Sequence, residues 1–240
     1  MIKSTAGDER PSIRVDRIVC LANSYKHDHR CVAGISLITN RWIRPIGNTI
    51  PGCLTLKESC YPDGKESAIL DVMEIELGEK CRSNCHPEDV FMSGEPWRFL
   101  RRFNQTADSR LLTKLTVKGP SLLGSSGDRL YRRKLDHSPA EGSLELIHPE
   151  DLWWWIRDDK GKRRNRALFR LGHAGRTRYD LPVTDPRWLD ALHLLPAGIY
   201  PHSFFYGGGQ LPQTFLTISL SEAFEGFHYK LVAGVVTLPG

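Results

Sequence analysis

Two groups of histidine and cysteine are the first candidates for chemistry. They are His27, His29 and Cys31, and Cys81, Cys85 and His86. Imidazole and thiolate are zinc ligands, but neither spacing matches a zinc finger, and the six cysteines include no CxxC pair. We therefore expect no bound metal, no cofactor, and thiols that stay unpaired in the core or at the surface.

Acidic residues raise a second possibility, metal-dependent cleavage of nucleic acid. Such a site needs clustered carboxylates and a lysine on a strand edge. The nearest set is Asp63, Asp71, Glu74, Glu76 and Lys80. Side-chain alternation along a strand would send Asp71 and the two glutamates to opposite faces. Nucleotide-hydrolysis, dinucleotide, kinase and α/β-hydrolase motifs are also missing from the sequence, so we favour a protein that is not an enzyme and keep a nuclease as the lesser alternative.

One segment concentrates the positive charge. The chain has 240 residues and a formal net charge of +5, yet nine basic residues and two acids lie between Arg157 and Arg178. The nine are Arg157, Lys160, Lys162, Arg163, Arg164, Arg166, Arg170, Arg176 and Arg178. A basic segment on a near-neutral protein is typical of a phosphate-backbone binder, because neutralised phosphates release counterions. A solvated hairpin tip would give the same pattern.

Aromatic residues beside arginines favour binding over catalysis. In Arg41-Trp42-Ile43-Arg44, a strand would place Trp42 and Arg44 on one face, where a stacking ring and a phosphate donor could share a surface. Trp42 could equally belong to the core. Trp153-Trp154-Trp155 on a helix would point three ways, and we expect this triplet to pack between modules.

The elements that must position these residues are mainly strands. We expect strands at 13–15 and 18–22, a hairpin of 30–39 with 41–46, and further strands at 68–77, 166–171, 176–183, 213–220 and 228–238. The tetrapeptide His-Pro-Glu-Asp occurs at 86–89 and at 148–151. Proline followed by acids is typical of a helix start, so both copies predict short helices, and Asp185-Pro186 predicts a third over 187–195.

A stretch rich in glycine, proline and serine divides the chain. It runs from Gly119 to Gly142. We therefore expect a first module over residues 12–118, a linker over 119–142 and a second module over 143–240. The sequence shows no apolar stretch of membrane-spanning length and no secretory signal, so we expect a cytoplasmic protein without membrane contact.

Several motifs together resemble a known family. The opening stretch Cys20-Leu21-Ala22-Asn23-Ser24, the pieces at 30–34 and 41–46, and the later pieces at 181–186, 218–224 and 229–233 resemble the dual OB-containing (DuOB) domain of prokaryotic proteins. The resemblance spans about residues 13–236. It implies two tandem OB-like β-barrel modules packed together, in a protein of bacterial conflict or immune systems that recognises nucleic acid.

The leading hypothesis is a non-enzymatic nucleic-acid-binding sensor or adaptor of a bacterial defence system. DNA or RNA would be held by backbone contacts at these residues: Lys26, Arg41, Trp42, Arg44, Lys162, Arg163, Arg164, Arg166, Arg170, Arg176 and Arg178. The alternative is a protein- or nucleotide-binding adaptor in a defence complex, whose basic segment docks on an acidic partner. The sequence leaves open DNA against RNA, single against double strands, and the oligomeric state.

Overall fold

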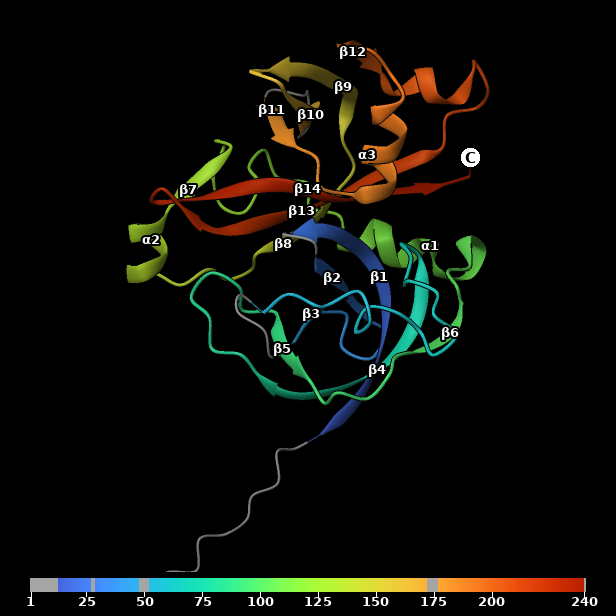
Figure 1. Cartoon of the computed structure of the whole chain (residues 1–240), viewed down its shortest axis with the longest axis vertical. Helices are drawn as coiled ribbons and strands as arrows, with labels where there is room; N and C mark the ends of the chain where they lie inside the picture. Colours follow the sequence, from blue (N-terminus) through green and yellow to red (C-terminus); the bar gives the residue numbers. More distant parts are fainter. Residues whose placement is uncertain (1–12, 27–28, 48–51, 172–176, 240) are drawn as a thin grey trace, which may run out of the picture.

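The computed structural model of the chain describes residues 13–26, 29–47, 52–171 and 177–239 (Figure 1). Strands make up most of it. Within these ranges lie three short α-helices, α1 (Gln105–Leu115), α2 (Arg132–His137) and α3 (Pro186–His193), and one 3-10 turn, η1 (His202–Tyr206). No helix in the described ranges has the length and apolar character needed to cross a membrane.

The first module is a closed five-stranded barrel. Its strands are β1 (Arg14–Lys26), β2 (His29–Ser36), β3 (Trp42–Ile46), β4 (Asp71–Lys80) and β5 (Asp89–Met92). They pair in the order β1-β2-β3-β5-β4, and β4 closes the barrel on β1. The β3–β5 pair is parallel and the others are antiparallel. This Greek-key circuit of five strands is an OB-type barrel, and β6 (Arg98–Arg102) extends it along β4.

The strand β1 is apolar on both faces because both faces are covered. Ile18 and Cys20 point into the first barrel, where they pack with Met73 and Trp97. Val19 and Leu21 alternate with them on the outside, yet they are fully buried too. Their cover comes from the second module, so one strand contributes to two cores.

The second module is built from two four-stranded sheets. One contains β9 (Glu150–Asp159), β10 (Lys162–Leu171), β11 (Thr177–Pro182) and β12 (Gly198–Pro201). The other contains β7 (Arg129–Tyr131), β14 (Phe227–Leu238), β13 (Gln213–Phe224) and β8 (Leu144–Ile147).

Both sheets of the second module enclose one apolar core. Trp154 and Phe169 of the first sheet pack there with Leu216 and Val232 of the second. A parallel bridge between Val183 and Val232 links the end of β11 to β14, and β8 runs on into β9. The strand order is therefore β9-β10-β11-β14-β13-β8. This is the order of an OB barrel in which the first strand is divided into β8 and β9. The predicted fold of two OB-like modules is confirmed.

The two modules meet along β1 and the β13–β14 pair, which lie side by side in Figure 1. Val19 and Leu21 of β1 and Ile35 of β2 pack on Phe215 and Val236. At Gly234 the backbones approach so closely that a Cβ would lie 2.2 Å from the carbonyl oxygen of Leu21. This position therefore accepts only glycine without a shift of one strand.

Both helices predicted at the His-Pro-Glu-Asp tetrapeptides are wrong, because each tetrapeptide leads into a strand. Asp89 begins β5 and Glu150 begins β9. Tertiary contacts hold the first copy extended: His86 Nε2 lies 3.1 Å from the carbonyl oxygen of Leu220, and Glu88 accepts hydrogen bonds from the amide and hydroxyl of Ser143. The tryptophan triplet consequently lies on the strand β9 and not on a helix.

The other main elements match the prediction. The hairpin is formed by β2 and β3. The helix α3 begins at Pro186, and the carboxylate of the preceding Asp185 caps it by accepting from the Trp188 amide at 3.3 Å. The strands β10, β13 and β14 cover the predicted ones, and β4 and β11 overlap the predicted ranges 68–77 and 176–183. Several elements were not predicted, namely α1, β5, β6, β8, β9, β12 and η1. The elements β7 and α2 lie inside residues 119–142.

Candidate nucleic-acid interface

The outward face of β9, β10 and β11 carries most of the basic segment. Strand alternation turns Trp154, Ala167 and Tyr179 into the core and leaves their neighbours outside. We call the outward set the arginine–tryptophan face: Trp153, Trp155, Arg157, Arg164, Arg166, Leu168, Arg170, Arg178 and Asp180. It corresponds to the strand 2 and 3 face on which OB barrels bind oligonucleotides.

Like charges stand opposite each other on this face. In the strand register Arg164 lies directly across from Arg157, and Arg170 directly across from Arg178. Directly opposed like charges destabilise a sheet. Bound anions, such as phosphates, would relieve this repulsion.

Aromatic rings lie between the arginines. The guanidinium of Arg157 sits over the Trp155 ring, 4.6 Å from its centroid. Trp153 is 42% exposed and lines an open groove of about 450 Å³ with Leu168, Arg170 and Arg178. Flat rings beside guanidinium groups are the elements with which proteins stack bases and hold phosphates of single strands.

Two carboxylates partly neutralise the face. Arg166 forms an ion pair with Asp180 and also donates to its carbonyl oxygen at 2.6 Å. Arg170 forms an ion pair with Asp151. Arg157, Arg164 and Arg178 are exposed, which leaves these three as the most accessible cations of the face.

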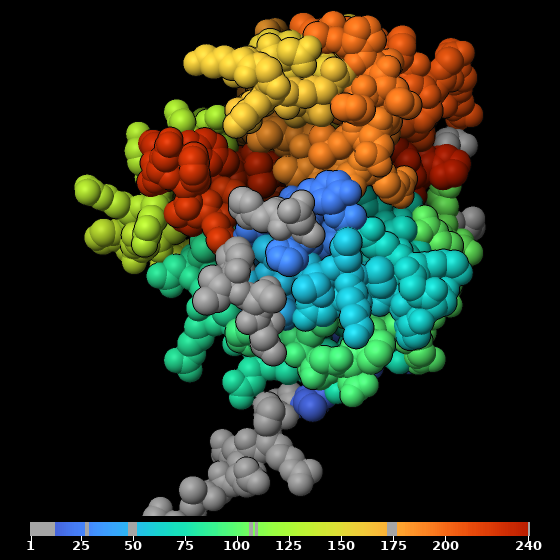
Figure 2. Space-filling model, viewed as in Figure 1, coloured from blue at the N-terminus to red at the C-terminus, as the bar shows by residue number. Residues whose placement is uncertain are grey.

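The turn between β9 and β10 extends the positive surface. Lys160 and Lys162 are exposed there, next to Asp158 and Asp159. In Figure 2 this segment, in yellow, projects from the edge of the molecule. Arg176 lies outside the described residues.

Arg163 has a different position from its neighbours. Its side chain turns toward α3, where Nη2 donates to the carbonyl oxygen of Leu192 at 3.1 Å and to that of Leu195. These carbonyls belong to the C-terminal end of α3, where a cation is favoured. Arg163 thus caps a helix and is not part of the arginine–tryptophan face.

The cations predicted on the first module are separated from that face. Lys26 Nζ lies 2.8 Å from Glu222 across the contact between modules, and this carboxylate raises the pKa of Lys26 against the effect of burial. Arg44 is 7% exposed and its Nε donates to Asp89 at 2.5 Å. Burial works against its charge, but Asp89 outweighs it and raises the pKa of Arg44. Lys26 and Arg44 are thus each engaged in an ion pair with a carboxylate of the protein itself.

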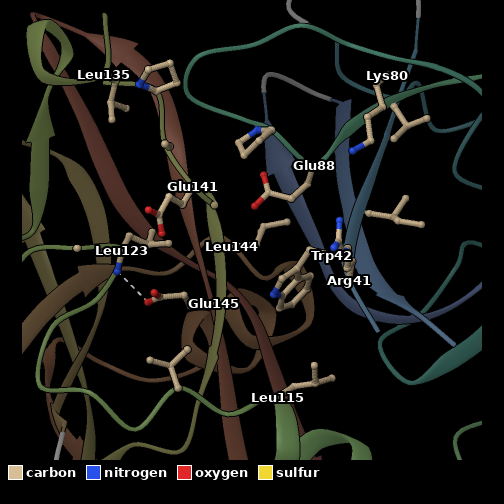
Figure 3. Close-up of a pocket in the computed structure, with 18 of the residues that line it drawn as sticks. Arg41, Trp42, Lys80, Glu88, Leu115, Leu123, Leu135, Glu141, Leu144 and Glu145 are labelled. Carbon is tan, nitrogen blue, oxygen red and sulfur yellow. Dashed lines mark hydrogen bonds between the residues drawn. The ribbon is translucent and has the colours of Figure 1, made fainter. Parts of the chain in front are cut away.

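Arg41 and Trp42 line another depression, a groove of about 1070 Å³ between the modules. Figure 3 shows them on one wall with Lys80 and Glu88, opposite Leu123, Glu141 and Glu145. Trp42 is half-buried and packs against Ala33 and Leu144. The structure therefore brings Arg41 and Trp42 together but places neither beside Arg164.

The first barrel does not expose its own strand 2 and 3 face. Ala33 and Ile35, which point outward from β2, are buried under Ala233 and Val236 of the second module. Only the second barrel presents this face free of protein contacts among the described residues.

Two members of the acidic set considered for a nuclease, Asp71 and Glu74, are used in structural contacts. Asp71 is buried, accepts from the Tyr61 hydroxyl at 2.8 Å and pairs with Arg102 at 2.5 Å. Glu74 pairs with Arg17 and Arg98, which lower its pKa. Across the described ranges, no three histidine, cysteine or acidic residues are grouped so that they could hold a metal ion.

Sequence reasoning missed Trp153, Trp155 and Arg157 as site residues. The available signal was the alternation itself, since a strand over 150–159 puts all three on one face. The tetrapeptide His-Pro-Glu-Asp at 148–151 predicted a helix there, so the two-residue alternation of a strand was not considered for residues 150–159.

The fold and this surface together define a protein with paired OB-type barrels, of which the second exposes a basic and aromatic strand face. Sequence comparison gives the same pairing of OB-type domains. The chain belongs to the family of the dual OB-containing domain, whose family model matches residues 16–235.

No curated protein matches the chain. Among solved structures, the chain is similar to a replication protein A heterotrimer bound to ssDNA, at 8% sequence identity and a TM-score of 0.34. The match covers 99% of this chain and 52% of that one, so the chain spans about half the length of this relative.

Proposed function

We propose that the arginine–tryptophan face binds nucleic acid, with arginines on phosphates and Trp153 and Trp155 stacked on bases. The observation that carries the proposal is the placement of these side chains on the strand 2 and 3 face of the barrel that leaves this face open. Contacts of this kind recognise backbone and ring surfaces more than sequence.

The test is a salt titration of fluorescence anisotropy with labelled single- and double-stranded DNA and RNA. Binding through about four to six phosphates should give a slope of log K against log salt of about −0.7 per phosphate on single strands and about −0.9 on duplex. In the variant Arg157→Gln with Arg164→Gln, each phosphate that is no longer neutralised should lower the magnitude of the single-strand slope by about 0.7.

The matched control removes two arginines from another exposed surface. Arg132→Gln with Arg133→Gln changes α2 by the same charge. This control should leave the slope unchanged. An equal decrease in both variants, or no binding by the wild type at low salt, would refute the proposed face.

We further propose that the bound nucleic acid is a signal and not a substrate, as in a sensor or adaptor of a bacterial defence system working in the cytoplasm. The support is the commitment of Asp71 and Glu74 to ion pairs, together with the family resemblance. Labelled oligonucleotide incubated with the protein and Mg²⁺ or Mn²⁺ should remain intact. Metal-dependent cleavage that disappears in Glu74→Ala would contradict this role.

The groove between the modules favours one alternative, a nucleotide-binding adaptor. Its volume of about 1070 Å³ is large enough for a small ligand, and it offers Trp42 for stacking beside Arg41 and Lys80. If mononucleotides bind with an affinity that falls in Trp42→Ala but not in Arg157→Gln with Arg164→Gln, the alternative is favoured.

A further inference from the structure

Cys31 and Cys53 face each other in the first barrel although they are 22 residues apart. Their sulfur atoms lie 3.9 Å from each other. Cys31 belongs to β2, and Cys53 lies on the chain that leads from β3 to β4. This pair is used neither by the arginine–tryptophan face nor by the groove of Arg41 and Trp42.

The backbone register is suited to a bond between the two sulfurs. Arg30 and Leu54 exchange both of their backbone hydrogen bonds, at 2.8 and 2.9 Å. This contact is an isolated antiparallel bridge, and Cys31 and Cys53 are the residues next to it on the two chains. In a regular antiparallel ladder residues so placed form a non-hydrogen-bonded pair, for which Cα atoms are typically about 4.5 Å apart. A disulfide spans Cα separations of about 4.4 to 6.8 Å, so closure needs an approach of the sulfurs and no change of strand pairing.

The surroundings of the pair favour one thiolate. The hydrogen bond from Cys31 and the charge of Lys26 lower the pKa of Cys53 despite its burial. The same hydrogen bond, together with burial, raises the pKa of Cys31. A thiolate next to a protonated thiol is the arrangement in which one sulfur attacks and the other resolves.

Access to the pair is narrow. Cys53 is 2% exposed and Cys31 is half-buried. A crevice of about 20 Å³ is lined by Cys31 together with Lys26, Arg44 and Gly52, and Cys53 adjoins it only through the 3.9 Å contact between the two sulfurs. Such a volume holds about one water-sized molecule, so it favours the smallest oxidants over bulky disulfides.

We propose that Cys31 and Cys53 form a peroxide-sensitive thiol pair that closes to a reversible disulfide. The Cys53 thiolate attacks one oxygen of hydrogen peroxide, the O–O bond breaks, and the departing hydroxide takes a proton from solvent to become water. Cys53 is now a sulfenic acid. The Cys31 sulfur attacks Cys53, the S–O bond breaks, and the hydroxyl leaves as a second water with the Cys31 proton. Two thiols are oxidised by two electrons while peroxide is reduced to two waters.

The test treats the full-length protein with hydrogen peroxide, alkylates the remaining thiols and maps the peptides without reduction. We expect a peptide linked through Cys31 and Cys53 that disappears with dithiothreitol. Cys60 and Cys81 are matched internal controls, because both are half-buried and burial raises the pKa of each. They should be oxidised at least about tenfold more slowly.

A variant separates the two steps. In Cys31→Ser the sulfenic acid at Cys53 has no resolving thiol, so it should persist and be detected by mass spectrometry of the intact protein as one added oxygen atom. If this variant fails to fold, the wild-type peptide map decides the question by itself. Oxidation of Cys60 and Cys81 as fast as the pair, or oxidation of the pair to sulfinic acid without a link, would overturn the proposal.

Discussion

The hydroxyl of Thr217 donates a 2.6 Å hydrogen bond to the carbonyl oxygen of Leu21. Thr217 is fully buried on β13 of the second module, and Leu21 lies at a β-bulge in β1 of the first. The bulge takes Leu21 out of the β1–β2 register, so its carbonyl can face the other module. A local irregularity in one barrel thus provides a polar attachment point for the other.

Removal of this hydrogen bond should weaken the contact between modules. Thr217→Val keeps the shape of the side chain but leaves the Leu21 carbonyl without this donor, at a cost of about 1 to 3 kcal/mol in the free energy of unfolding. Chemical denaturation measures it. Thr237→Val, at a half-buried threonine of the neighbouring β14, is the control. An equal loss of unfolding free energy in both variants would show that the hydrogen bond to Leu21 does not stabilise the protein beyond an ordinary threonine.

Adjacent arginines should have separable effects. Arg163→Ala removes the cap on α3 and should lower the stability by about 1 kcal/mol without changing nucleic-acid affinity. Arg164→Ala removes an exposed cation of the arginine–tryptophan face and should weaken binding with little change in stability. Denaturation and anisotropy on both variants test this contrast. Weaker binding in a folded Arg163→Ala protein would contradict it.

The exposed ring of Trp153 should contribute to the affinity for single strands. Trp153→Ala should reduce binding by about 1 to 3 kcal/mol, the range found for stacked bases. Phe99→Ala, at a 45% exposed ring of the first module, is the matched control and should have no effect. Wild-type affinity of the Trp153 variant would limit the interface to phosphate contacts.

Acid should destabilise the second module through His202. The indole of Trp154 donates to His202 Nδ1 at 3.1 Å, so the neutral ring carries its proton on Nε2, 2.8 Å from Thr214 Oγ1. Burial lowers the pKa of His202 from 6.5 to about 4. Between these values the unfolded chain binds a proton that the folded protein does not, so stability falls as the pH falls.

The variant His202→Gln should reduce this loss. After allowance for partial exposure, we expect the change in unfolding free energy between pH 7 and pH 4 to be smaller than in the wild type by about 1 to 2 kcal/mol. Urea denaturation at both pH values gives the difference. His86, whose pKa burial lowers to about 3, adds a similar loss that this variant keeps. An identical pH dependence in wild type and variant would exclude His202 as a cause.

Breaking the ion pair inside the first module should be costly. Arg44→Ala leaves Asp89 as a buried, unpaired charge, which costs about 3 to 5 kcal/mol. Replacing Arg44 and Asp89 together by leucine should cost much less, because no unpaired charge remains. Denaturation of the single and double variants checks both statements. A mild effect of the single variant would mean that water reaches Asp89.

The pattern of apolar residues predicted most long strands. These strands have either one apolar and one polar face, which gives alternation, or two buried faces, which gives a continuous apolar run. The hairpin β2–β3 and the strands β13 and β14 follow directly from apolar residues and turns. The helix α3 was predictable from Asp185, whose carboxylate caps it locally. Each of these elements is determined by residues within or next to it.

The parts that were not predictable depend on distant partners. Glu88 binds Ser143, 55 residues away, and Asp89 binds Arg44, so the acids that look like a helix start are used in barrel contacts. The burial of Arg44 has the same origin, since its partner is known only once β3 and β5 pair. The basic segment was recognisable from composition, but its division into Arg163 inside and Arg164 outside requires the strand register.

Burial of the outward side of β2 under β14 makes the two barrels unequal, although they share a topology. Tandem barrels with free faces could bind one strand twice and gain avidity. In the described part of the chain a single such face is free, so the protein is expected to be monovalent on this surface. Its footprint on a single strand would then be that of one OB barrel, about 4 to 16 nucleotides, and longer oligonucleotides would bind more molecules and not bind one molecule more tightly.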